Sequence, residues 1–78
     1  TYYCVIDSGF NNGINVIAAA EIKYSNLPQL TKGNFMAFED LNAPMNFVIT
    51  PSSDDYIFKE SIRVCSLKAF LFNYLPSL

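Results

Sequence analysis

The feature that most constrains this sequence is that its apolar residues come in short segments, each followed by turn residues. No purely apolar run is longer than five residues, as in Val-Ile-Ala-Ala-Ala over residues 16–20. A membrane-spanning helix needs about 20 such residues, so we expect no span. Strands are usually about 5–6 residues long, which these segments match. We therefore predict a mainly β protein with one domain over residues 1–78.

The balance of residues indicates a folded chain with a small core. Half of the 78 residues (51%) are hydrophobic and only 15% are charged, which is the opposite of the balance in disordered segments. A chain this short buries only about 60% of the surface that its unfolded form exposes. The core is therefore marginal, and we expect an additional stabilising element.

The two cysteines could supply that element. Cys4 and Cys65 lie near the two ends of the chain, in apolar surroundings. In a small exported domain an even cysteine number usually means a disulfide, here Cys4–Cys65, and the alternative is two buried free thiols in a cytosolic protein. Such a bridge would close a loop of about 60 residues and add roughly 4 kcal/mol. The start at Thr1 without Met fits a secreted chain whose signal peptide has been removed, and equally a trimmed one.

The first two thirds of the chain predict four strands. Asn12-Gly13 is a strong hairpin signal after the first strand, and residues 25–33, with the turn Lys32-Gly33, predict a loop. Alternation over residues 14–24 favours a strand with one wet face (Asn15, Glu21, Lys23), although a helical pattern is also present there. The predicted strands cover residues 2–7, 14–24, 34–39 and 45–50, with a turn over residues 40–44.

The last third supports two interpretations. Residues 51–55 could form a hairpin loop that leads to strands at about 56–64 and 66–73, which gives a small antiparallel β-sandwich of five or six strands with one disulfide. Alternatively, Ser52 or Ser53 could cap a C-terminal helix at about 54–74, which gives an α+β protein with a four-stranded antiparallel sheet. We favour the sandwich, because the segment carries many middling helix formers.

The sequence offers little catalytic chemistry. It contains no histidine, which removes the commonest general base and most zinc sites. The carboxylate pairs Glu39-Asp40 and Asp54-Asp55 lack the spacing of a calcium loop and fit turn or capping positions. We therefore predict no catalytic, cofactor-binding or metal residue, no cofactor, and no enzyme. Five scattered basic residues and a net charge of −2 also argue against nucleic-acid binding.

The opening residues resemble a known family. Tyr-Tyr-Cys-Val-Ile-Asp-Ser-Gly over residues 2–9, followed by a turn and a long alternating segment, looks like the start of MAX effectors. These are small secreted virulence proteins of plant-pathogenic fungi, related to Magnaporthe avirulence proteins and the ToxB toxin. The resemblance covers the first 24 residues and the cysteine layout. It implies a six-stranded β-sandwich whose disulfide joins the first strand to the region of the fifth, where Cys4 and Cys65 would sit.

These features together suggest a binding function. Five tyrosines are typical of interfaces, and residues 69–75 are apolar on both faces, so as an edge strand they would invite strand addition. We expect a small secreted, non-enzymatic binding protein, a fungal virulence effector that engages a host protein through an exposed sheet edge. The alternatives are a membrane-active or killer-type toxin and a small structural subunit of an oligomer.

Overall fold

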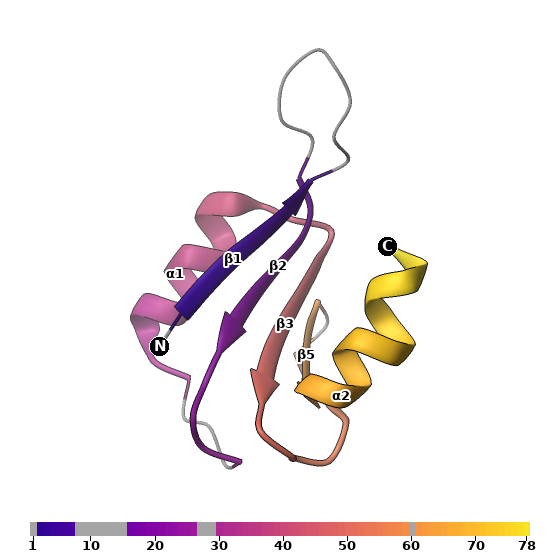
Figure 1. Cartoon of the computed structure of the whole chain (residues 1–78). Helices are drawn as coiled ribbons and strands as arrows, with labels where there is room; N and C mark the ends of the chain where they lie inside the picture. The colour runs from indigo at the N-terminus through magenta and orange to yellow at the C-terminus, as the bar shows by residue number, and fades with distance from the viewer. Residues whose placement is uncertain (1, 8–15, 27–29, 60) are drawn as a thin grey trace.

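The described part of the chain forms one mixed β-sheet with a helical segment on each face (Figure 1). The structure is a computed structural model and describes residues 2–7, 16–26, 30–59 and 61–78. The strands are β1 (Tyr2–Asp7), β2 (Val16–Ile22), β3 (Met45–Thr50), β4 (Tyr56–Lys59) and β5 (Ile62–Ser66). The helical elements are α1 (Lys32–Leu41), then α2 (Leu67–Ala69), the π-helical turn η1 (Phe70–Tyr74) and the 3-10 turn η2 (Leu75–Ser77). The last three are continuous and are here called the C-terminal helix.

The strand order is β1-β2-β3-β5-β4, with two antiparallel outer pairs and two parallel inner pairs. Parallel neighbours cannot be joined by a tight hairpin and need a crossover connection. The connection from β2 to β3 contains α1, and the connection from β3 to β5 contains β4. The fold is therefore α+β, and the predicted β-sandwich is wrong because helices, not a second sheet, cover the strands.

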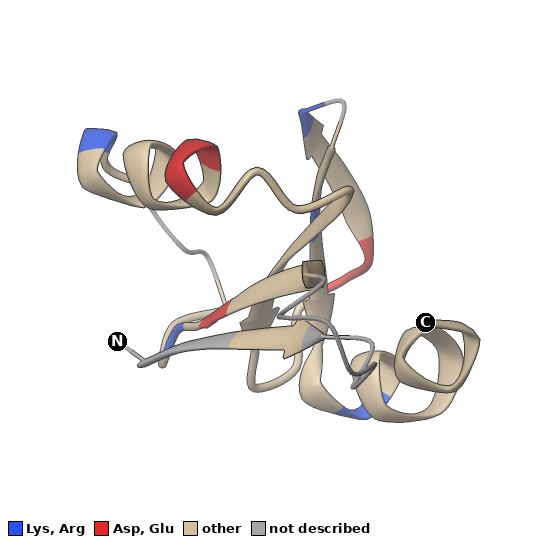
Figure 2. Cartoon of the chain, turned by 90° about the horizontal axis from the view of Figure 1, so that it is seen from above, with Lys and Arg blue, Asp and Glu red and all other residues tan. Residues whose placement is uncertain are grey.

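The central strand β3 is buried on both faces. Phe47 and Ile49 pack with Cys65 and with Phe70 of the C-terminal helix. On the opposite face, Val48 packs with Phe38 of α1. Figure 2 shows the two helices on opposite sides of the sheet. No helix in the described part of the chain is long and apolar enough to span a membrane.

Helix α1 replaces the strand predicted over residues 34–39 and the turn predicted at Lys32-Gly33. Its start is a capping box: the Thr31 hydroxyl accepts from the Asn34 backbone N–H (3.3 Å), and Asn34 Oδ1 accepts from the Thr31 N–H (3.0 Å). Its end is Asn42, in the left-handed conformation with φ 49°. The prediction failed because Phe35 and Phe38 fit the helical period of 3.6 better than the strand period of 2.

The last third of the chain combines both predicted interpretations and matches neither. β4 and β5 form an antiparallel pair, and the helix begins only at Leu67, where the Ser66 hydroxyl accepts from the Ala69 N–H at 3.0 Å. The predicted helix at about 54–74, with Ser52 or Ser53 as its cap, is therefore wrong, and so is the strand at 66–73. The four-stranded antiparallel alternative is wrong as well, because the sheet has five strands and two parallel pairs.

The strands predicted over residues 2–7 and 45–50 are confirmed as β1 and β3, and the strand predicted over residues 14–24 is confirmed over Val16–Ile22 as β2. The wet face predicted for residues 14–24 is wrong at Glu21, which is only 4% exposed because α1 covers this face. Asn15 and the predicted turn at Asn12-Gly13 lie outside the described residues.

The topology does not allow the predicted Cys4–Cys65 disulfide. Cys4 pairs with Ala20 of β2, Ala20 pairs with Phe47 of β3, and β5 follows next. Three strand spacings, roughly 14 Å, therefore separate β1 from β5. A disulfide needs Cα atoms within about 7 Å. Cys65 is instead a buried free thiol.

We predict that reduction with dithiothreitol leaves the melting temperature unchanged. Burial, with a smaller contribution from the nearby Asp55 carboxylate, raises the pKa of the Cys65 thiol to about 11. At pH 8 the native thiol should therefore resist iodoacetamide and react only after unfolding, as intact-mass measurement would show. A lower melting temperature on reduction, or a native mass two hydrogens short, would contradict this topology.

Candidate functional site

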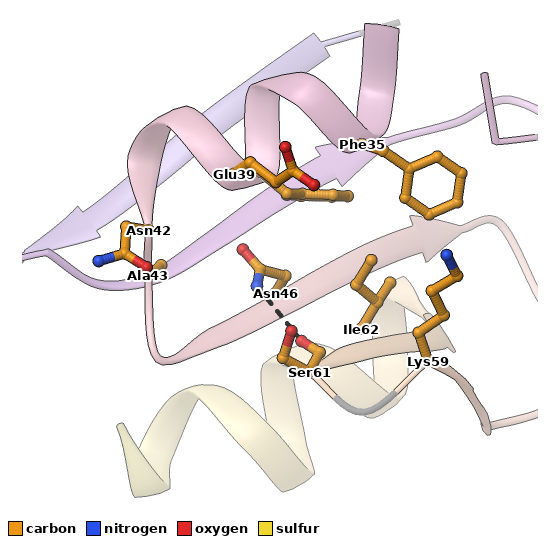
Figure 3. Close-up of a pocket in the computed structure, with 9 residues that line it drawn as sticks. Phe35, Glu39, Asn42, Ala43, Asn46, Lys59, Ser61 and Ile62 are labelled. Atoms are coloured by element: carbon orange, nitrogen blue, oxygen red, sulfur yellow. Dashed lines mark hydrogen bonds between the residues drawn. The ribbon is translucent and has the colours of Figure 1, made fainter. Parts of the chain in front are cut away.

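A cavity of about 540 Å³ lies between α1 and the β3–β5–β4 half of the sheet (Figure 3). Its apolar lining comes from Phe35 and Phe38 on α1, Ala43 after that helix, and Ile62 on β5. Small-molecule sites usually have volumes of about 300–1,000 Å³, so the cavity is large enough for a compact ligand. Its polar lining consists of Glu39, Asn42, Asn46, Lys59 and Ser61.

The most buried polar group in the cavity lining is the amide of Asn46, a residue that is 5% exposed. Its Nδ2 donates to the Ser61 carbonyl at 3.3 Å, whereas its Oδ1 has no hydrogen-bond partner among the described residues. Figure 3 shows this oxygen directed toward α1 and away from Ser61. The opposite amide orientation would place two acceptor oxygens against each other, so the oxygen must face the cavity. Asn46 thus offers a buried acceptor to whatever enters.

Two opposite charges line the outer part of the cavity. Glu39 extends from α1, and Lys59 from the end of β4 (Figure 3). The Lys59 ammonium lies 4.6 Å from the centre of the Phe35 ring, and it makes no ion pair within the described part of the chain. Phe35 in turn stacks on Phe58 of β4, with ring centres 5.9 Å apart. The cavity and strand β4 therefore adjoin.

Strand β4 is a second candidate, because it ends the sheet and all four of its residues are exposed. Ile57 is 63% exposed, and Tyr56 and Phe58 are 41% and 44% exposed. Three consecutive large apolar side chains at a sheet edge are unusual, since natural edges are commonly protected by charge or proline. The register shift between Ile57 and Lys59 is a bulge, which limits the regular edge to its first residues.

The C-terminal helix carries a further exposed apolar stripe, formed by Leu67, Leu71, Phe72 and Leu75. Lys68 is the only charged residue after Cys65, and most of this helix is uncharged in Figure 2. The sequence left open whether residues 69–75 form an edge strand that invites strand addition, and the structure shows that they are helical. Phe70 and Tyr74 instead pack edge-on and tilted against Phe47, on the face of the sheet.

A buried polar cluster holds α1 on the sheet. Asn34 Nδ2 donates to the Glu21 carboxylate at 2.7 Å, and Lys23 Nζ donates to Asn34 Oδ1 at 3.1 Å. Lys23 Nζ also lies 3.8 Å from the same Glu21 carboxylate. Since Asn34 belongs to the capping box as well, one side chain links the start of α1 to strand β2.

On the other face, Asp55 accepts hydrogen bonds from Arg63 (2.6 Å) and from the Tyr74 hydroxyl. Burial alone would raise the pKa of Asp55, but the hydrogen bonds from Tyr74 and Arg63 outweigh it and lower that pKa. The hydrogen bond to Asp55 raises the pKa of Tyr74. This cluster ties the loop before β4 to the C-terminal helix and has the character of a structural clamp.

The carboxylate pairs seen in the sequence do not converge. Glu39 and Asp40 lie on α1, and Asp54 and Asp55 lie in the loop before β4. No group of three or more potential metal ligands occurs among the described residues. Sequence reasoning predicted the strand over residues 45–50 but did not single out Asn46 as a candidate functional residue. Only the helical signal of Thr31 and Asn34 could have revealed the cover above it.

We predict that Asn34→Ala lowers the free energy of unfolding by about 1–3 kcal/mol, because the buried Glu21 carboxylate loses its hydrogen-bond donor. Urea denaturation followed by circular dichroism measures the change. Asn73→Ala is the matched control, since Asn73 is exposed and should shift stability by less than about 0.5 kcal/mol. Equal effects of the two substitutions would mean that Asn34 does not hold α1.

We also predict that Asp55 contributes to acid sensitivity. Its carboxylate is favoured in the folded state, so its stabilisation is present above the ordinary pKa of 3.8 and is lost as pH falls through the lower folded value. The side chain is 34% exposed, so the contribution is below about 1 kcal/mol. Melting temperatures of Asp55→Asn should therefore fall less below pH 4 than those of Asp54→Asn and wild type. Parallel curves for all three proteins would disprove this role.

Comparisons with known proteins leave the function to be argued from this geometry. No family model, no curated protein and no solved structure matches the chain. The resemblance of the opening residues to MAX effectors stays a prediction, although the sandwich that it implied is not the fold observed.

Proposed function

We propose that this protein is a non-enzymatic binding module that takes up an extended segment of a partner protein as an added strand beside β4. The observation that carries the proposal is that β4 ends the sheet while Tyr56, Ile57 and Phe58 are exposed in succession. An edge strand offers unpaired backbone donors and acceptors to an incoming chain.

The side chains of β4 indicate what such a segment would carry. Ile57 lies opposite Arg63, on the face of the C-terminal helix, where the Arg63 guanidinium lies 5.2 Å from the Tyr74 ring. Phe58 stacks on Phe35, so it lies on the α1 face. An added strand would therefore place apolar side chains beside β4 on both faces of the sheet.

Charge adds a second element of selectivity. Lys59 ends β4, and its ammonium lies over the Phe35 ring. This ammonium has no ion-pair partner among the described residues, so a carboxylate in the partner segment could pair with it at the rim of the interface. The segment that we propose is thus extended, apolar at several positions, and acidic near the end that meets Lys59.

The edge is a better candidate than the stripe on the C-terminal helix. A helix satisfies its backbone groups internally, so the stripe offers side chains alone. An edge strand adds a row of directional hydrogen bonds to its side-chain contacts, which determine register as well as affinity. The export and host-effector parts of the earlier expectation depended in part on the disulfide and on the implied sandwich, and they are not included in this proposal.

Selection of peptides on the immobilised whole chain tests the proposal. A display library of random peptides of about ten residues should yield sequences with several apolar positions and a carboxylate. In NMR titrations these peptides should shift the backbone amides of β4 and β5. Ile57→Lys should weaken binding at least tenfold, because it replaces an apolar side chain within the interface by a positive charge, in addition to that of Lys59.

Val5→Lys is the matched control, since Val5 is 41% exposed on β1, at the opposite edge of the sheet. It should leave the affinity unchanged. Equal weakening by both substitutions, or selected peptides that shift residues of the C-terminal helix instead, would rule out strand addition at β4.

A further inference from the structure

We propose that the cavity beneath α1 binds a small neutral molecule with a flat apolar body and an N–H donor, such as an aromatic carboxamide, through Asn46 Oδ1. The site is separate from the strand-addition edge in its chemistry, because it would take a small ligand rather than a polypeptide. It therefore stands or falls independently of the proposed function.

We infer that the ligand carries an N–H donor from the unpaired oxygen of Asn46. Its Oδ1 is buried, faces the cavity and has no partner in the described part of the chain. Leaving a buried acceptor unpaired costs stability, so nearly all such groups in folded proteins are satisfied. The other end of the amide is engaged with the Ser61 carbonyl, so Asn46 cannot turn to satisfy itself. A ligand N–H that enters the cavity would complete this group.

We infer that the body of the ligand is apolar from the side chains that line the cavity. Phe38 is 4% exposed and packs in the core beneath α1 together with Ile62. The ring of Phe35 adds an aromatic surface on the side of Lys59. Aromatic and aliphatic side chains surrounding one buried polar group form the usual pattern of a small-molecule site. The flat ring of an aromatic ligand matches such walls through stacking and edge contacts.

We infer that the ligand is neutral from the two opposite charges at the rim of the cavity. Glu39 and Lys59 carry opposite formal charges, and both line the cavity. A cationic ligand would be attracted by Glu39 and repelled by Lys59, and an anion would experience the reverse. A neutral carboxamide avoids either repulsion. Its carbonyl oxygen can also accept from the Lys59 ammonium or the Ser61 hydroxyl, two donor groups in the lining.

Titration of the ¹⁵N-labelled whole chain with benzamide and with methyl benzoate tests the proposal. The two probes are similar in shape and neutral, but only benzamide has N–H donors. We expect benzamide to shift the amides of Asn46 and Ser61 and to bind about 3- to 10-fold more tightly than the ester. Asn46→Ala should abolish this preference without abolishing ester binding. Asn26→Ala should retain it, since Asn26 is an exposed asparagine that bonds to Ser52.

A measurement on the wild-type protein locates the ligand even if the Asn46→Ala variant fails to fold. In the wild-type protein, benzamide ring protons should give nuclear Overhauser effects to the methyl groups of Ile62, which line the cavity. Equal affinity for the two probes would overturn the proposal. So would a preference that survives Asn46→Ala, Overhauser effects to residues outside the cavity, or no binding of benzamide at millimolar concentration.

Discussion

Burial of the central strand β3 on both faces is the constraint on which the rest of the structure depends. Every residue from Asn46 to Thr50 is buried. A strand in this position needs cover on each side, as is usual for parallel sheets. Helix α1 supplies one cover and the C-terminal helix the other (Figures 1 and 2). Among the described residues, the five strands form one sheet, and these two helical segments cover its faces.

Both candidate sites follow from this limited cover. The α1 helix is anchored at its start, where Asn34 bonds to Glu21 of β2. Toward the other half of the sheet, the space between helix and strands becomes the cavity that contains Asn46. Strand β4 lies farthest from β2 in the strand order, and its residues stay exposed. The same shortage of covering elements thus leaves an accessible cavity and an apolar edge side by side.

The sequence predicted individual strands better than their arrangement. The segments that became β1, β2 and β3 carry β-branched and aromatic residues in short runs, which is a local signal. Helix α1 was missed although Thr31 and Asn34 form a capping box, because Phe35 and Ala37 also alternate as in a strand. That error concealed the candidate site. Without a helix above it, Asn46 reads as an ordinary outward polar residue, and no cavity can be inferred.

The sequence by itself predicted one small domain, the strands β1, β2 and β3, and little histidine-based chemistry, because it contains no histidine. These properties depend on composition and on neighbouring residues. Tertiary structure alone decided that β2, β3 and β5 run parallel, and this order separates Cys4 from Cys65 by two intervening strands. It also decided that Asn46 is buried and that Ile57 is exposed. Both outcomes depend on contacts between residues distant in the chain, which no local pattern encodes.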